Sequence, residues 1–121
     1  MRVGETGLTM TLARNFRETV RARASRDPEF REALFQDAVS ALLRREVAEG
    51  RAGLRAYINA TIGIERLSVV LGRPEKSLMH MFGPSGNPTA ENLLGVISAL
   101  QAETSVHLEV RAVAAQSRSI P

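Results

Sequence analysis

Apolar residues recur at helical spacing along most of the chain, and short segments rich in glycine and proline separate these stretches. Leu12, Phe16 and Val20 lie four residues apart among arginines, which predicts an amphipathic helix with a narrow apolar stripe. An Asp-Pro-Glu sequence at residues 27–29 predicts the start of the next helix. Asp caps free backbone N–H groups, and proline in the first turn removes no hydrogen bond. The pattern therefore predicts two N-terminal helices.

The second of these helices has an apolar face wide enough to be covered on two sides. Beyond a charged interruption at residues 44–46, helical spacing resumes and continues to residue 62. Gly50 and Gly53 lie in this third stretch, and each weakens a helix by about 1 kcal/mol relative to Ala. Tyr57 lies at a core spacing, so we expect a buried ring with its hydroxyl at the edge. The wide face of the second helix consists of two stripes, Leu34, Ala38 and Leu42 beside Phe35, Val39 and Leu43.

Residues 64–83 predict two short helices joined by a tight turn. Ile64, Leu67 and Leu71 share one face of the first, and Gly72 can adopt the left-handed conformation that ends it. Pro74 suits the first turn of the second helix. This second helix has an apolar inward face and a cationic outward face, an arrangement typical of a helix-turn-helix. Its inward residues are Leu78, Met81 and Phe82, and the outward residues are Arg73, Lys76 and His80.

A loop and a longer helix follow. Residues 83–88 contain nearly every turn-forming residue type. Thr89 then predicts an N-cap, with Glu91 in the first turn. We expect the core face of this helix to consist of Leu93, Leu94, Ile97 and Leu100.

With these residues in view, the segment GIERLSVVLGRPEKSLMHMFG…GNPTAENLLGVISAL resembles the lambda-repressor-like (Cro-type, XRE-like) DNA-binding domain. The stretch NATIG…LSVVLGRPEKSLMHMFGPSGNPTAENL is similar to the small antidote (antitoxin) proteins of addiction modules. The resemblance implies a regulator that represses its own operon and neutralises a small RelE/HigB-like toxin ribonuclease. Two residues depart from the Cro-type pattern: Ile64 replaces a phosphate-binding Gln, and Pro74 replaces a capping Ser or Thr.

Residues 105–113 alternate between apolar and polar, which predicts a β-strand. No second strand is predicted in the chain, and an isolated strand leaves unpaired backbone groups along both edges. We therefore expect this strand to pair with another chain, either its own copy in a homodimer or the sheet edge of a partner. The residues assigned to dimerisation are Val106, Leu108 and Val110.

Composition limits the fold class and the expected cellular location but does not identify a partner. The 121 residues are 44% hydrophobic but only 4% aromatic, so the core consists mainly of aliphatic side chains, which favours helices. The formal net charge of +3 does not by itself require a nucleic-acid partner. The absence of cysteine excludes disulfides, and no signal peptide or membrane span is evident, so we expect a soluble, cytoplasmic protein.

Candidate DNA contacts come from the second short helix and from the loop after it. Their side chains can donate to guanine or phosphate, or contact a thymine methyl group. For the loop, the alternative to DNA binding is a plain connector, and the two are weighed equally. For His80, the alternative is a solvated side chain without a function, and it is also weighed equally. Metal binding is not expected, because neither histidine has a companion at ligand spacing. The candidates are Arg73, Lys76, Ser77, Met79, His80, Ser85, Gly86 and Asn87.

These observations predict an all-α, lambda-repressor-like fold with two extra N-terminal helices and one C-terminal dimerisation strand. The expected function is sequence-specific repression by a homodimer on double-stranded operator DNA. We expect no cofactor and no enzymatic activity, since no nucleophile or acid–base set is evident. The alternative is a protein-interaction module that binds a toxin and has a vestigial helix-turn-helix. The expected segments are a disordered tail at 1–9, a helical extension at 10–45, the Cro-type domain at 46–104, the strand at 105–113 and a disordered tail at 114–121.

Overall fold

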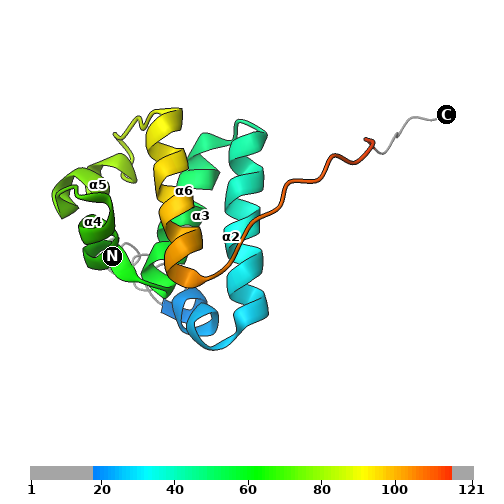
Figure 1. The fold of residues 1–121 in the computed structure, drawn as a ribbon, viewed down its shortest axis with the longest axis horizontal. Coiled ribbons are helices and arrows are strands. Elements are labelled where there is room, and N and C mark those ends of the chain that lie inside the picture. The colour runs from blue at the N-terminus through cyan, green and yellow to red at the C-terminus, as the bar shows by residue number, and fades with distance from the viewer. Residues whose placement is uncertain (1–17, 116–121) are drawn as a thin grey trace, which may run out of the picture.

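The computed structural model describes residues 18–115, and all regular secondary structure in this range is helical. This confirms the expectation of an all-α fold. The N-terminal stripe residues Leu12 and Phe16 and both predicted tails except residues 114–115 lie outside the described residues. A helical segment at 18–26 precedes α2 (Pro28–Leu43), α3 (Val47–Ala60), α4 (Gly63–Leu71), α5 (Glu75–Met81) and α6 (Ala90–Thr104) (Figure 1).

Three helix ends form as their local sequences predict. The Asp27 carboxylate accepts a hydrogen bond from the Phe30 N–H at 3.2 Å, and Pro28 is the first residue of α2. The Thr89 hydroxyl accepts one from the Asn92 N–H at 3.1 Å and caps α6. Each such cap stabilises a helix by about 1 kcal/mol. Gly72 ends α4 with φ 66° and ψ 35°, the left-handed conformation expected of it.

The close packing of α2 against α3 depends on two glycines. A Cβ atom added at Gly50 would lie 2.5 Å from the Leu42 side chain, and one added at Gly53 would lie 2.7 Å from Cβ of Ala38. Both distances are too short for any side chain. The sequence shows Gly50 and Gly53 as a cost to the helix, whereas the structure shows that they allow α3 to approach α2.

One hydrophobic core joins α2 to the helices that follow it. The Phe35 ring of α2 stacks on the Tyr57 ring of α3 at a centroid distance of 4.3 Å. Tyr57 is fully buried, and its hydroxyl donates to the Thr104 hydroxyl at the end of α6 at 2.9 Å, as expected for a core ring with its hydroxyl at the edge. The α2 part of the expected segment 10–45 therefore shares a core with the expected segment 46–104. This core also contains Ala38, Leu54, Ile58, Leu67, Leu78, Met81, Phe82, Val96, Ile97 and Leu100.

Two leucines assigned to core faces are exposed. Leu94 is 64% exposed, because it is rotated by about 100° from Leu93, and the inward face of α6 continues from Leu93 to Val96, Ile97 and Leu100. Leu43 is 67% exposed; it is the last residue of α2, where the turn at 44–46 leads the chain away into α3. The assignments of Leu43 and Leu94 to the core were wrong.

The chain after α6 is extended but is not a strand in this structure. Ser105, with φ 58°, ends α6, and residues 106–115 run across α2 and away from the helices (Figure 1). A strand requires a hydrogen-bonded neighbour, and the described part of the chain offers none. Val106 and Leu108 pack against this chain's own core, whereas Val110 is 78% exposed. Of the three predicted dimerisation residues, Val110 is thus the one left largely free for a partner.

Candidate nucleic-acid interface

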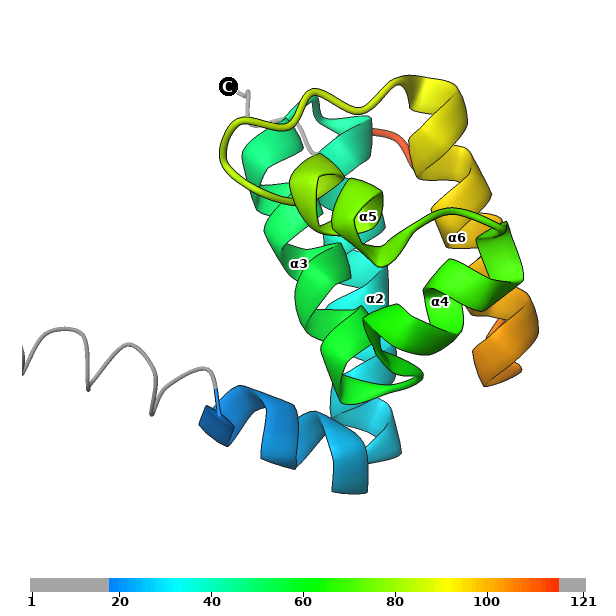
Figure 2. The same ribbon diagram turned by 90° about the vertical axis from the view of Figure 1, so that its left-hand side faces the viewer.

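The predicted pair of short helices corresponds to α4 and α5, and a single serine fixes the turn between them. Ser68 accepts a hydrogen bond from the Arg73 N–H through its backbone carbonyl at 3.1 Å. Its hydroxyl donates to the Arg73 carbonyl at 2.6 Å. Together with the left-handed Gly72, these two bonds set the direction in which the chain enters α5. Figure 2 shows α4 and α5 lying in front of α3 on one side of the molecule.

α5 separates its apolar and polar side chains as the sequence predicts. Leu78 is fully buried, and Met81 and Phe82 are at most 7% exposed, so one face is anchored in the core. The helix begins at Glu75, and Pro74 is its N-cap, one position earlier than expected. The rest of the helix is open to solvent, and its exposed side chains are Glu75, Lys76, Ser77, Met79 and His80.

Arg73 lies at the start of α5 and is held from α6. Its guanidinium Nη2 donates to the Asn92 side-chain oxygen at 2.7 Å, and both groups are exposed. This hydrogen bond uses one of five guanidinium N–H donors, so the others remain available to an anion. A hollow of about 240 Å³ lies beside it, between the end of α4 and the first turns of α6. Asn92 was not among the predicted site residues, and no sequence pattern pairs it with Arg73.

The loop after α5 is packed against the helix end. A Cβ atom at Gly86 would collide with the backbone carbonyl oxygens of His80 and Met81. The Gly86 N–H donates to the Gly83 carbonyl at 3.1 Å, so it is already engaged and does not point freely at a phosphate. Ser85 and Asn87, the other two loop candidates, are exposed.

Arg51 of α3 forms hydrogen bonds with this loop. Its Nη1 donates to the Gly83 carbonyl at 3.2 Å and to the Gly86 carbonyl at 2.5 Å. Its Nε is buried and has no hydrogen-bond partner among the described residues. Hydrogen bonds from charged donors stabilise by about 1.5–3 kcal/mol each, so Arg51 fastens the loop to α3. The sequence places Arg51 in a helix but gives no sign of this contact, which spans more than thirty residues of chain.

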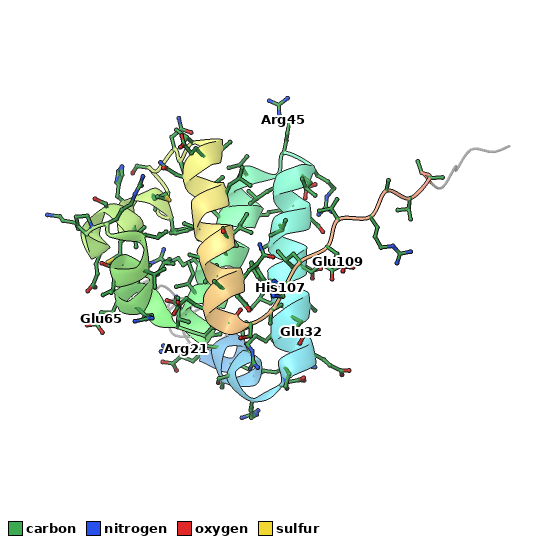
Figure 3. All side chains as sticks on the ribbon, in the orientation of Figure 1. Arg21, Glu32, Arg45, Glu65, His107 and Glu109 are labelled. Carbon is green, nitrogen blue, oxygen red and sulfur yellow. The ribbon has the colours of Figure 1, made fainter. Side chains whose placement is uncertain are left out.

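Acidic side chains accompany the cations of this surface. Glu75 lies in the first turn of α5 and Glu91 in the first turn of α6, where each carboxylate is stabilised by the positive end of its helix dipole. Glu65 projects from α4 on the same side of the molecule (Figure 3). The described residues contain no group of three or more His, Cys, Asp or Glu side chains placed to hold a metal ion. Among the described helices, none has the length and apolarity needed to cross a bilayer.

A groove of about 790 Å³ lies between the helical segment 18–26, α3 and the first residues of the loop after α5. Its lining includes three small side chains one turn apart on α3, together with three arginines and one glutamate. Because alanines give little hydrophobic signal in the sequence, the pattern did not reveal this surface. The alanines are Ala48, Ala52 and Ala56, the arginines are Arg21, Arg51 and Arg55, and the glutamate is Glu18.

The chain matches no protein-family model, and it has no match among curated proteins or among solved structures.

Proposed function

We propose that the chain is a sequence-specific DNA-binding regulator of the lambda-repressor-like, helix-turn-helix class, with α5 as its recognition helix. One observation carries the proposal. The inward face of α5 is buried at Leu78, Met81 and Phe82. The outward side chains are exposed to solvent, and they are Lys76, Ser77, Met79 and His80. A helix presented in this way can enter the major groove of B-DNA.

The outer face offers both kinds of contact that such a helix requires. Arg73 and Lys76 supply donors for phosphate or for guanine O6 and N7, and phosphate contacts give affinity and orientation. Ser77 and His80 can donate or accept at base edges, and the 52% exposed Met79 can contact a thymine methyl group. The exposed loop residues Ser85 and Asn87 extend the same surface toward the DNA backbone.

In this proposal the chain acts as a homodimer on an operator, as an antitoxin that represses its own operon and binds a small RelE/HigB-like toxin. The support for the antitoxin role is the resemblance of residues 59–93 to addiction-module antidotes. The support for a homodimer is the extended C-terminal segment, which has no ladder partner in the described part of its own chain.

A second candidate function is favoured by the groove on α3. In this alternative the chain is a protein-interaction module with a vestigial helix-turn-helix, and the groove receives an acidic helix of a toxin. The three alanines of the lining permit close approach of a backbone. Its three arginines outnumber its one acid, Glu18, so the lining complements negative charge. The absence of a phosphate-binding Gln at Ile64 is consistent with this alternative.

The two candidates differ in DNA binding. A labelled duplex from the region upstream of the gene and a shuffled duplex are titrated with the protein by fluorescence anisotropy. The proposal predicts binding to the upstream duplex tighter by a factor of about 10³ or more. His80→Ala reduces that ratio by about five- to a hundredfold, whereas Arg45→Ala, at an exposed site away from α4 and α5 (Figure 3), leaves it unchanged. Equal affinity for both duplexes favours the interaction module.

A further inference from the structure

The extended segment after α6 presents a free backbone edge. The Leu108 N–H donates to the Gln101 side-chain oxygen at 2.9 Å, so it points back toward the helices. Backbone groups of alternate residues point to the same side of an extended chain, so those of residues 109 and 111 point to the opposite side. No backbone hydrogen bond involves residues 109–115 within the described residues.

The side chains of this segment divide at Leu108. Val106 and Leu108 are half-buried against the core, whereas all described residues from Glu109 onward are exposed. Val110 and Val113 are each 78% exposed, the largest exposed fractions among the large apolar side chains described. Figure 3 shows His107 and Glu109 on the segment where it passes over α2, before the chain leaves the helices.

We infer that this segment pairs with the same segment of a second copy, antiparallel, with the two-fold axis at Val110. In that register Glu109 lies opposite Arg111 of the second copy, and Arg111 opposite its Glu109. Residues directly opposite in an antiparallel pair point to the same face, so both ion pairs form on one face and Val110 meets Val110 on the other. The free edge at residues 109 and 111 then supplies the hydrogen-bonded pairs, and Val110 occupies the closer, non-hydrogen-bonded position.

Neighbouring symmetric registers are less favourable. An axis at Glu109 sets two carboxylates opposite each other, and an axis at Arg111 sets two guanidinium groups opposite each other. An axis at Leu108 would place Leu108 at the centre of the interface, although its side chain packs on the core of its own chain and its N–H is already hydrogen-bonded. A shift by one residue would place the apolar face of one strand against the polar face of the other. The alternation and charge order of residues 108–112 thus favour a second copy over an unrelated sheet edge.

This inference deepens the proposed function, because a homodimer presents two copies of α5 to one duplex. Its test contains no DNA, so its failure is distinguishable from a failure of DNA binding. The chain has no cysteine, which makes single-cysteine cross-linking direct. Val110→Cys places two thiols at the axis, within reach of a disulfide, whereas Val113→Cys places them about 20 Å apart along the strands.

The expected result on mild oxidation of the full chain is a disulfide-linked dimer for Val110→Cys and little or none for the equally exposed Val113→Cys. Equal cross-linking of the two variants, or none in either, would overturn the inference. A monomer at all concentrations in sedimentation velocity would also overturn it, and would leave the segment to a partner protein.

Charge reversal tests the register. Glu109→Arg and Arg111→Glu each convert both cross-strand pairs into like-charge pairs, and each should raise the dimer dissociation constant about tenfold or more at low salt. The double reversal should restore the dimer, and mixing the two single variants should give a heterodimer. Leu43→Asp, at an exposed apolar site on α2, is the control and should leave the dissociation constant unchanged. A double reversal no better than the single variants would contradict the Val110 axis.

Discussion

The guanidinium of Arg73 and the side-chain amide of Asn92 are joined by a 2.7 Å hydrogen bond between the start of the proposed recognition helix and the first turn of α6. The bond orients Arg73 without neutralising it, because an amide carries no charge. An arginine already ordered on the free protein loses less conformational entropy when it meets a phosphate. The pair is therefore a preorganised contact in the proposed interface.

A double-mutant cycle on this pair measures the preorganisation. Arg73→Ala removes the charge and should weaken DNA binding by about five- to a hundredfold. Asn92→Ala keeps the charge and should weaken it by about two- to fivefold, since only the ordering is lost. The double variant should bind like Arg73→Ala in fluorescence anisotropy. If the two effects multiply instead, Asn92 acts independently of Arg73 and the preorganisation argument is wrong.

Alanine substitutions at Gly86 and, as a control, at Gly95 test the packing of the loop after α5. Gly86→Ala places a Cβ against the carbonyl oxygens of His80 and Met81 and should lower the free energy of unfolding by about 1–3 kcal/mol. Gly95→Ala, in α6, meets nothing within 4 Å and should raise it by about 0.5–1 kcal/mol. Urea unfolding followed by circular dichroism measures both. Stability unchanged by Gly86→Ala would show that the loop is not packed as described.

Ionisation of Tyr57 should lower the free energy of unfolding at alkaline pH. Burial raises the pKa of its hydroxyl above the ordinary value of about 10, and the hydrogen bond with Thr104 opposes this more weakly. The folded state therefore holds the proton more tightly than the unfolded state does. The resulting stabilisation is fully present below pH of about 10 and is lost as the pH rises through the folded-state pKa.

The measurement compares unfolding free energies of the wild type and Tyr57→Phe across this pH range. The difference between them should shrink as the pH rises, because phenylalanine does not titrate. Tyr57 is the only tyrosine in the chain, so the ultraviolet absorbance of its phenolate reports the same ionisation directly. A phenol that titrates at or below its ordinary pKa would contradict the burial described here.

Local sequence rules predict the helices and their ends well. Asp27, Gly72 and Thr89 each act on backbone groups within a few residues, so their roles are readable from the sequence alone. Periodicity also separates the two faces of α5. It errs where a helix face is decided by neighbours, as at Leu94, whose exposure depends on which side of α6 the other helices cover.

The contacts that shape the candidate site are long-range and were not predictable. Arg51 reaches Gly83 and Gly86 from another helix, and Arg73 reaches Asn92 across nineteen positions. No local rule encodes these pairings. The C-terminal segment shows the same limit. Its alternation predicts an extended chain, but whether an extended chain becomes a strand depends on a partner outside the sequence.

The most direct test of the central claim, that the outer face of α5 binds duplex DNA, is the salt dependence of affinity for the upstream duplex. Lys76→Ala is compared with wild type and with Arg45→Ala, which removes one charge at the end of α2, away from α4 and α5 (Figure 3). If Lys76 contacts a phosphate, log affinity should fall linearly with log salt, with a slope shallower by about one for Lys76→Ala and a wild-type slope for Arg45→Ala. Identical slopes for all three proteins, or no binding at low salt, would contradict this claim.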